Sequence, residues 1–345
     1  MQRVTIIGLG LVGGSIGLGL RRWSSAQPGG RALHITGFDT DLDHQQHAKK
    51  LGAVDDAEWK MANAVQGADL VILAIPVAAM KESLGDIAPY LRQGAVVTDV
   101  GSTKADVLAW AGESLPAGVG FVGGHPMAGK AQSIEAAEAD LFKGATWCVC
   151  PAVTANEDAN KVVLGMIAAL GAEPFFIDPH EHDAYVAGVS HLPFIVSSAL
   201  MRTVATDPSW RDMRALTATG FRDLTRLAAG SAEMHRDIVL TNALAVERWV
   251  DAMVAELLAF KVMTRGDDSA GRLLAFFDSA RDARADWSTQ TTREGELLQE
   301  TRDELSSVNM SGQMTRMLFG NFAGRRRPTD RRGTAAKRGG GPDDS

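Results

Sequence analysis

The chain has 345 residues, 45% of them hydrophobic and 22% charged, and a formal net charge of −7. These values are ordinary for a globular protein of about two domains. No apolar run reaches the length of about 18 residues that a membrane span needs. The N-terminal "MQRVTIIGLG" lacks the regions of a signal peptide, so we expect a cytoplasmic protein with no membrane partner.

Strand and helix patterns alternate through the first half of the chain. Apolar, β-branched stretches predict strands at 3–10, 32–39, 68–76, 95–102, 118–122 and 145–151. The segments between them are typical of helices, for example "SIGLGLRRW" and "TKADVLAWAGE". Strands that are apolar on both faces and separated by helices indicate a parallel sheet covered by helices. We therefore predict an α/β Rossmann-type domain over residues 1–178.

The pattern becomes helical after about residue 178. Asp178 as N-cap, Pro179 at the first helical position and Glu181 at the third form a helix-start signal. Helical patterns then continue to about residue 320 with little strand pattern. We predict an all-α domain over residues 179–322, which would serve substrate binding and dimerisation.

The C-terminal segment, residues 323–345, differs in composition from everything before it. Residues 325–345 hold seven Lys/Arg and three Asp, a net charge of +4 that leaves −11 for the rest of the chain. Because this basic, Gly-rich segment has no apolar periodicity, we predict that it is disordered. A basic tail can contact nucleic acid, but the body of the chain shows no such surface, so we expect no nucleic-acid partner.

The chain has two cysteines, Cys148 and Cys150, one residue apart in "ATWCVC". On a strand they would point to opposite faces, so a bond between them is not expected. Two cysteines also supply no metal framework. We predict buried small hydrophobic residues and no metal site.

A glycine motif stands near the N-terminus. "GLGLVGGS" places Gly8, Gly10 and Gly13 in G-x-G-x-x-G spacing between a strand and a helix, the context of a dinucleotide-binding turn. The glycines allow a tight turn, and backbone N–H groups at the helix start, near Leu11 and Val12, can hold a pyrophosphate. A tight turn without a ligand is the alternative.

An acidic residue, Asp39 of "GFDTD", ends the second predicted strand, 26 residues after Gly13. The usual spacing is about 20 residues, and the insertion "SSAQPGGRA" accounts for the excess. A carboxylate here is expected to bond the ribose 2′-OH and to repel a 2′-phosphate, which favours NAD over NADP. A solvated strand end is the alternative for Asp39.

Cofactor chemistry in such a sheet lies at the carboxyl ends of the strands. Three strand ends carry candidates: Ala74, Ile75 and Pro76 of "AIP", Ser102 of "DVGSTK" and His125 of "GGHPMAG". The glycines and the proline of the last motif are expected to exclude a helix and a well-formed strand, and to let the backbone approach a ligand. His125 can exchange a proton near neutral pH, although a single histidine is more often structural. In place of a role in the site, Ser102 could cap the following helix, and Lys104 could be a solvated surface charge.

Five motifs occur in a characteristic order: "GLGLVGGS", "DVGSTK", "GGHPMAGK", "SHLPF" and "GFRDLTRLAAG". Together they resemble the prephenate/arogenate dehydrogenase family of tyrosine biosynthesis, over about residues 1–320. "HPMAG" and "FRDLTRLA" are the most specific parts of this resemblance. It implies hydride transfer from the ring carbon that bears the 4-hydroxyl of prephenate to NAD, followed by loss of CO2 to give 4-hydroxyphenylpyruvate.

The resemblance also implies roles for single residues. His125 would accept the proton of the ring hydroxyl, Ser102 would hydrogen-bond that hydroxyl and the histidine, and Arg226 would hold a substrate carboxylate, which an arginine fork suits. Arg226 is alternatively a surface charge. His191 of "SHLPF" is expected either to line the site or to form a helix–helix contact. The family's helical domain usually forms a dimer, and helices over 241–263 and 292–307 would suit that interface.

Two positions depart from the family pattern. Many members have "HLPH", where this chain has Phe194, and many have a tryptophan where this chain has His235. Both changes concern substrate recognition and leave open the choice between prephenate and arogenate, the latter giving tyrosine directly. Neither change touches the hydride chemistry.

Two other classes of protein compete with this interpretation. A β-hydroxyacid or 6-phosphogluconate-type dehydrogenase also joins a Rossmann domain to a helical one, but it usually relies on a lysine in the helical domain. The helix predicted over 179–206 has no lysine. A non-catalytic NAD sensor would bind the dinucleotide and need neither His125 nor Arg226.

Overall fold

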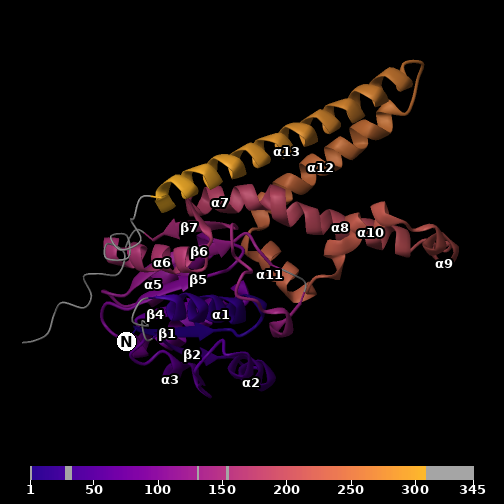
Figure 1. Cartoon of the computed structure of the whole chain (residues 1–345). Helices are drawn as coiled ribbons and strands as arrows, with labels where there is room; N and C mark the ends of the chain where they lie inside the picture. The colour runs from indigo at the N-terminus through magenta and orange to yellow at the C-terminus, as the bar shows by residue number, and fades with distance from the viewer. Residues whose placement is uncertain (1, 28–32, 130–131, 153–154, 308–345) are drawn as a thin grey trace, which may run out of the picture.

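The structure is a computed structural model that describes residues 2–27, 33–129, 132–152 and 155–307. One eight-stranded sheet, in the order β3-β2-β1-β4-β5-β6-β7-β8, forms the centre of the N-terminal part (Figure 1). The strands are β1 (Gln2–Ile7), β2 (Leu33–Phe38), β3 (Asp56–Ala57), β4 (Leu70–Leu73), β5 (Val96–Asp99), β6 (Gly120–Pro126), β7 (Thr146–Pro151) and β8 (Glu173–Phe176). β3 and β8 were not predicted from the sequence.

The sheet is mostly parallel, which confirms the predicted Rossmann-type class. Strands β1 to β6 all run in one direction. β7 differs from the prediction because it is antiparallel to β6, and β8 is parallel to β7. A parallel crossover needs a long connection, usually a helix. The described part of the β6–β7 connection contains only the one-turn helix η2 (Ile134–Ala136), which packs on α1.

The prediction that the glycines and the proline of "GGHPMAG" exclude a strand is wrong, because β6 continues through Pro126. Gly123 and Gly124 pair with Cys150 and Val149 of β7. A Cβ on Gly124 would lie 2.6 Å from the carbonyl oxygen of Asp99, so no larger residue fits there. The glycines therefore serve close packing of an extended chain, and they place His125 inside the sheet.

Helices cover both faces of the sheet. On one face α1 (Leu11–Ala26) and α6 (Glu157–Ala169) pack on residues such as Ile6 and Ile72. On the other face α4 (Val77–Ile87) and α5 (Ala105–Ser114) pack on residues such as Val71 and Val97. The short helices α2 (Leu42–Leu51) and α3 (Met61–Ala64) lie near β2 and β3. Because both faces are covered, the carboxyl edge of the parallel strands is the place left for a site.

All described elements after β8 are helical, as predicted. They are α7 (Pro179–Val186), a π-helical turn (Ala187–His191), α8 (Leu192–Ala205), α9 (Trp210–Met213), the 3₁₀ turn η4 (Arg214–Leu216), α10 (Thr219–Thr225), the 3₁₀ turn η5 (Arg226–Ala229), α11 (Ala232–Thr241), α12 (Ala243–Met263) and α13 (Ser269–Ser307). The predicted start of α7 is confirmed, since the Asp178 side chain accepts hydrogen bonds from the N–H groups of His180 and Glu181. Residues 308–345, with the predicted tail, lie outside the described residues.

The continuous helix Pro179–Ala205 is long and apolar enough, by length and composition, to cross a membrane, with a mean hydropathy of 1.4 in its best 18-residue window. A core helix of a soluble protein meets the same criterion. This helix carries four buried polar side chains, those of His182, Asp183, His191 and Ser197.

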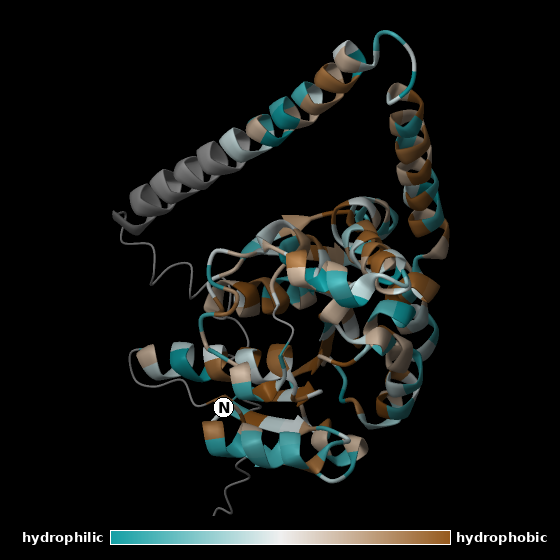
Figure 2. Cartoon of the chain, turned by 90° about the vertical axis from the view of Figure 1, so that its right-hand side faces the viewer, coloured by the Kyte–Doolittle hydropathy of each residue, from teal (hydrophilic) through white to brown (hydrophobic). Residues whose placement is uncertain are grey.

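Helices α12 and α13 form an arm that reaches away from the rest of the chain (Figures 1 and 2). Several large apolar side chains on this arm are exposed: Leu244, Val254, Leu257, Leu258, Val262, Leu274, Phe277 and Trp287. An exposed apolar surface of this extent marks an interaction site.

Candidate active site

The glycine turn between β1 and α1 has three glycines with different roles. Gly8 has φ of 94°, and a Cβ there would lie 2.2 Å from the carbonyl oxygen of Ala74. A Cβ on Gly13 would lie 1.9 Å from the carbonyl oxygen of Gly8, so both positions need glycine for packing. Gly10, the N-cap of α1, has open space where its Cβ would be and offers no side-chain cap.

This open space lies at the first turn of α1, where backbone N–H groups lack intrahelical acceptors. Such an end binds phosphate. Leu11 and Val12 are the first residues of this turn. The loop with Ala74 and Ile75, which precedes Pro76 at the start of α4, packs against Gly8. The turn therefore fits the pyrophosphate of a dinucleotide.

Asp39 follows β2 and is held next to the glycine turn. Its Oδ2 accepts a hydrogen bond of 2.6 Å from the N–H of Leu9, and its Oδ1 accepts one of 2.8 Å from the N–H of Asp41. The Nδ1 atom of His44 lies 3.5 Å from Oδ2. A carboxylate has about four acceptor sites, so Asp39 keeps acceptor capacity for ribose hydroxyls while the backbone bonds fix its orientation.

His125 lies near the end of β6, at the same sheet edge. Its side chain is buried, and its Nδ1 lies 2.9 Å from Nε2 of His182, with the two rings edge to face. Burial lowers the pKa of His125 well below its ordinary value. Within the described part of the chain no group hydrogen-bonds its Nε2. A neutral imidazole with one free nitrogen can act as a general base.

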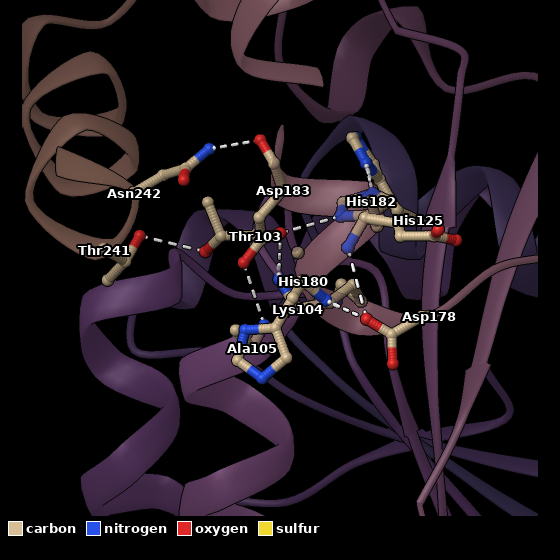
Figure 3. A network of polar contacts seen from close by, with 12 residues as sticks. Thr103, Lys104, Ala105, His125, Asp178, His180, His182, Asp183, Thr241 and Asn242 are labelled. Atoms are coloured by element: carbon tan, nitrogen blue, oxygen red, sulfur yellow. Dashed lines mark hydrogen bonds and ion pairs between the residues drawn. The ribbon is translucent and has the colours of Figure 1, made fainter. Parts of the chain in front are cut away.

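Behind His125 lies a network of polar groups from α7, the start of α5 and α12 (Figure 3). The Nδ1 atom of His182 lies 2.8 Å from Oδ1 of Asp183. The two carboxylate oxygens of Asp183 accept hydrogen bonds from the N–H groups of Lys104, at 2.8 Å, and Ala105, at 2.9 Å. The Asn242 amide donates to the carbonyl oxygen of Asp183 at 2.7 Å. Asp183 therefore caps α5 from another part of the chain.

The Lys104 side chain is fully buried, so the alternative prediction that it is a solvated charge is wrong. Its ammonium forms an ion pair with the carboxylate of Asp99, which is also fully buried. Asp99 in turn accepts hydrogen bonds from the N–H groups of Gly101, at 2.8 Å, and Gly124, at 3.1 Å. A buried charge needs such a partner and such donors. Asp99 therefore connects the end of β5 both to Lys104, through the ion pair, and to Gly124, which precedes His125, through a hydrogen bond.

His191 is the second buried histidine that the sequence singled out. It ends the π-helical turn between α7 and α8, a distortion that often marks a functional site. Its Nδ1 lies 3.3 Å from the Asn242 amide, whereas its buried Nε2 has no hydrogen-bond partner among the described residues. Burial lowers the pKa of His191 to about 4, so the ring is neutral at physiological pH.

Ser102 is not the cap of α5, because Lys104 is the N-cap residue and Asp183 supplies the capping oxygens. The backbone of Ser102 lies beside His191. The hydrogen-bond partner of His125 in the described chain is His182, and none is formed with Ser102.

Arg226 begins η5, which packs on α8, and its side chain is exposed, without an ion pair among the described residues. The structure does not bring it into the network behind His125. The two residues that depart from the family pattern do meet. Phe194 and His235 stack with ring centroids 4.1 Å apart and planes 1° from parallel. Phe194 also lies 6.0 Å from His191, centroid to centroid.

Four residues of this site were not found from the sequence: Asp99, His182, Asp183 and Asn242. Asp99 lies inside the strand predicted over 95–102, and an acidic residue within that mostly apolar stretch was a signal for it. His182 and Asp183 follow the predicted helix start, but their direction toward His125 depends on how α7 packs. Nothing in the sequence signals Asn242.

The fold and the site define a class of protein, a dinucleotide-binding dehydrogenase of the Rossmann type with a helical second domain. Two family models match the chain, "Prephenate dehydrogenase, nucleotide-binding domain" at residues 20–174 and "Prephenate dehydrogenase, dimerization domain" at residues 178–278. The chain belongs to the prephenate dehydrogenase family.

Relatives agree with this assignment. The chain is 33% identical to prephenate dehydrogenase of Bacillus subtilis over 284 residues, which covers 81% of this chain and 75% of that protein. It is 34% identical to prephenate dehydrogenase of Lactococcus lactis, over 70% of this chain and 65% of that protein. The structure of Aquifex aeolicus prephenate dehydrogenase in complex with hydroxyphenyl propionate and NAD+ has a TM-score of 0.75 and 28% identity, over 83% of this chain and 98% of that chain. The structure of Synechocystis arogenate dehydrogenase has a TM-score of 0.66 and 27% identity, over 82% of this chain and all of that chain.

Proposed function

We propose that this protein is an NAD-dependent prephenate dehydrogenase, which converts prephenate to 4-hydroxyphenylpyruvate and CO2 in tyrosine biosynthesis. The observation that carries the proposal is the buried, neutral His125, whose Nε2 is free at the sheet edge that also holds the glycine turn. Arogenate dehydrogenase, with the same ring chemistry, is the second candidate, because the similar Synechocystis protein is an arogenate dehydrogenase.

Five residues would hold the cofactor at the glycine turn: Gly8, Gly10, Leu11, Val12 and Gly13. Asp39 would bind the adenosine ribose, and residues 74–76 would line the opposite side of the turn. When bound, NAD supplies the acceptor for the hydride of the substrate.

His125 would then handle the proton of the 4-hydroxyl. As the C–H bond at the same ring carbon breaks and its electron pair leaves as hydride, the electron pair of the O–H bond forms the ring carbonyl and the proton moves to Nε2 of His125. As CO2 leaves, the electron pair of the breaking C–C bond moves into the ring and a negative charge develops on the 4-oxygen. This oxygen can take the proton back from His125. Proton transfer by a positioned side chain accelerates a reaction by about 10²–10⁴. Ser102 and His191 are proposed to contact the hydroxyl side of the substrate.

The direct test is a panel of initial rates with the purified full chain and NAD. Prephenate, arogenate and a small β-hydroxy acid are compared under the same conditions. We expect the highest kcat/KM with prephenate. A preference for arogenate would select the second candidate, and turnover of the β-hydroxy acid alone would reject both.

Asp39 predicts the choice of cofactor. Repulsion of the 2′-phosphate is expected to make kcat/KM with NAD at least about tenfold higher than with NADP, which corresponds to about 1.4 kcal/mol. Asp39→Asn keeps an acceptor for the N–H of Leu9 and removes the charge, so it is expected to narrow the preference. Asp43→Asn, at an exposed position on the first turn of α2, is the matched control and should leave the preference unchanged. Equal use of both cofactors by the unmodified protein would contradict the assignment.

Arg226 is proposed to pair with a substrate carboxylate. Loss of one partner from a charge pair that binding buries costs about 2–5 kcal/mol, or about 30-fold or more in binding. We therefore expect Arg226→Ala to raise KM for prephenate at least about 30-fold, with kcat little changed if the contact is equal in ground and transition states. NAD affinity and Tm should stay near wild type. Arg222→Ala, exposed on the preceding turn, is the control, and an unchanged KM in Arg226→Ala would remove Arg226 from the site.

We also infer a homodimer, a cytoplasmic location and a boundary between the two domains at residues 178/179. The apolar surface of the arm formed by α12 and α13 supports the homodimer, as does the match to a dimerisation domain. The change from strands to helices between Phe176 and Pro179 supports the boundary. The location rests on the sequence alone.

A further inference from the structure

We propose that His182 and Asp183 are positioning residues that hold His125 in the tautomer whose Nε2 is free to accept a proton. The three side chains form one chain of hydrogen bonds, from Asp183 through His182 to His125 (Figure 3). The role of this arrangement in catalysis rests on the proposed function. The tautomer of His125 does not depend on that function, because it is a property of the protein without substrate.

The direction of each hydrogen bond follows from Asp183. Its two oxygens accept backbone N–H groups at the start of α5, so the side chain is placed as an ionised acceptor. Nδ1 of His182, 2.8 Å from Oδ1, must then carry a proton and donate it. A neutral imidazole has one N–H, so Nε2 of His182 is an acceptor. It faces Nδ1 of His125 at 2.9 Å, which must donate, and Nε2 of His125 is left without a proton.

Burial of the three side chains favours this one arrangement of donors and acceptors over others. His182 is 1% exposed, Asp183 5% and His125 8%, so water competes little for these bonds. Hydrogen bonds in such surroundings are stronger than in water, and an unmade one is costly. The charge of Asp183 is favoured by the N-terminus of α5, where negative groups are stabilised. The Asn242 amide, which donates to the Asp183 carbonyl oxygen, holds this turn of α7 in place.

The arrangement also prepares His125 for the charge that the reaction creates. When Nε2 takes the substrate proton, the ring becomes an imidazolium and its Nδ1–H donates more strongly to His182. His182 is in turn polarised by the carboxylate of Asp183. No proton has to leave His125 for this stabilisation, so Asp183 stays ionised, as the carboxylate of a Ser-His-Asp triad does.

The test uses the full chain labelled with ¹⁵N in its histidine side chains, without substrate. Nitrogen chemical shifts distinguish a protonated ring nitrogen from a bare one, and the His125→Asn spectrum assigns the His125 signals. In the unmodified protein we expect Nδ1 of His125 to be protonated and Nε2 bare. In His182→Phe, which removes the acceptor and keeps a ring, we expect loss of this single tautomer. The kcat for prephenate is expected to fall about tenfold to a hundredfold, as when an orienting partner of a functional histidine is removed.

Two further variants separate positioning from a structural role. Glutamine offers an amide oxygen to His125 and an amide N–H to Asp183, so His182→Gln is expected to restore both the tautomer and most of kcat. His180→Phe, at an exposed position of the same helix, is expected to leave both unchanged. A bare Nδ1 on His125 in the unmodified protein would overturn the proposal, and so would a wild-type kcat in His182→Phe. If the unmodified protein does not turn over prephenate, the proposed function fails, while the tautomer signals still decide this proposal.

Discussion

Replacing His125 by asparagine is expected to lower kcat for prephenate by about 10²–10⁴, the usual contribution of a positioned general base. The substitution removes the only nitrogen of this side chain that the polar network leaves free, and the amide nitrogen that replaces the ring is a donor and cannot act as a base. NAD affinity is expected to change by no more than a few fold, because the glycine turn and Asp39 are separate from this side chain. Steady-state rates and a fluorescence titration with NAD measure the two quantities.

The pH dependence of the unmodified protein adds a second expectation for His125. Because burial lowers its pKa well below the ordinary value of about 6.5, the base form is already complete at neutral pH. The kcat/KM is therefore expected to be flat between about pH 6.5 and 8 and to fall only at lower pH, where the ring becomes protonated. A His125→Asn protein with near wild-type turnover in this range would show that the histidine is structural.

The second large effect concerns stability. Lys104→Met keeps the aliphatic volume of the side chain but removes the ammonium, which leaves the Asp99 carboxylate buried without its cation. Breaking a buried ion pair by removing one partner costs about 3–5 kcal/mol of unfolding free energy. Urea unfolding at one fixed protein concentration measures this loss, since a dimer's stability depends on concentration.

Two comparisons make the Lys104 result specific. The double variant Asp99→Asn, Lys104→Met removes both charges and is expected to recover part of the stability, because a neutral amide is less costly to bury but its single oxygen accepts from only one of the N–H groups of Gly101 and Gly124. Arg22→Met breaks the exposed ion pair of Arg22 with Asp140 and is expected to cost at most about 1 kcal/mol. A loss as small for Lys104→Met as for Arg22→Met would show that the buried pair contributes no more than a surface pair.

The predictions from sequence succeeded where local patterns decide the structure. The strands β1, β2, β4 and β5 are short apolar runs between helices, and the Asp178–Pro179 signal marks the start of α7. The glycine spacing predicted a turn that depends on backbone geometry, and the structure agrees at Gly8 and Gly13. In each case residues close in sequence determine the outcome.

The errors arose where distant residues decide. The chain through Gly123 and Gly124 stays extended because it pairs with β7, which no local pattern reveals. Lys104 is buried because Asp99 faces it across a turn, although lysine is usually solvated. The packing of α7 against the start of α5 brings His182 and Asp183 to His125 from more than fifty residues away in the chain.

Oxidation and decarboxylation of prephenate with NAD are tested together by following all products in one reaction. Purified full chain, prephenate and NAD are incubated, and NADH, CO2 and 4-hydroxyphenylpyruvate are measured in the same sample at several times. We expect the three to form in equal amounts, and His125→Asn to form all three more slowly by the same factor. No NADH formation from prephenate, or NADH without an equal amount of CO2, would show that the chain does not catalyse this oxidative decarboxylation.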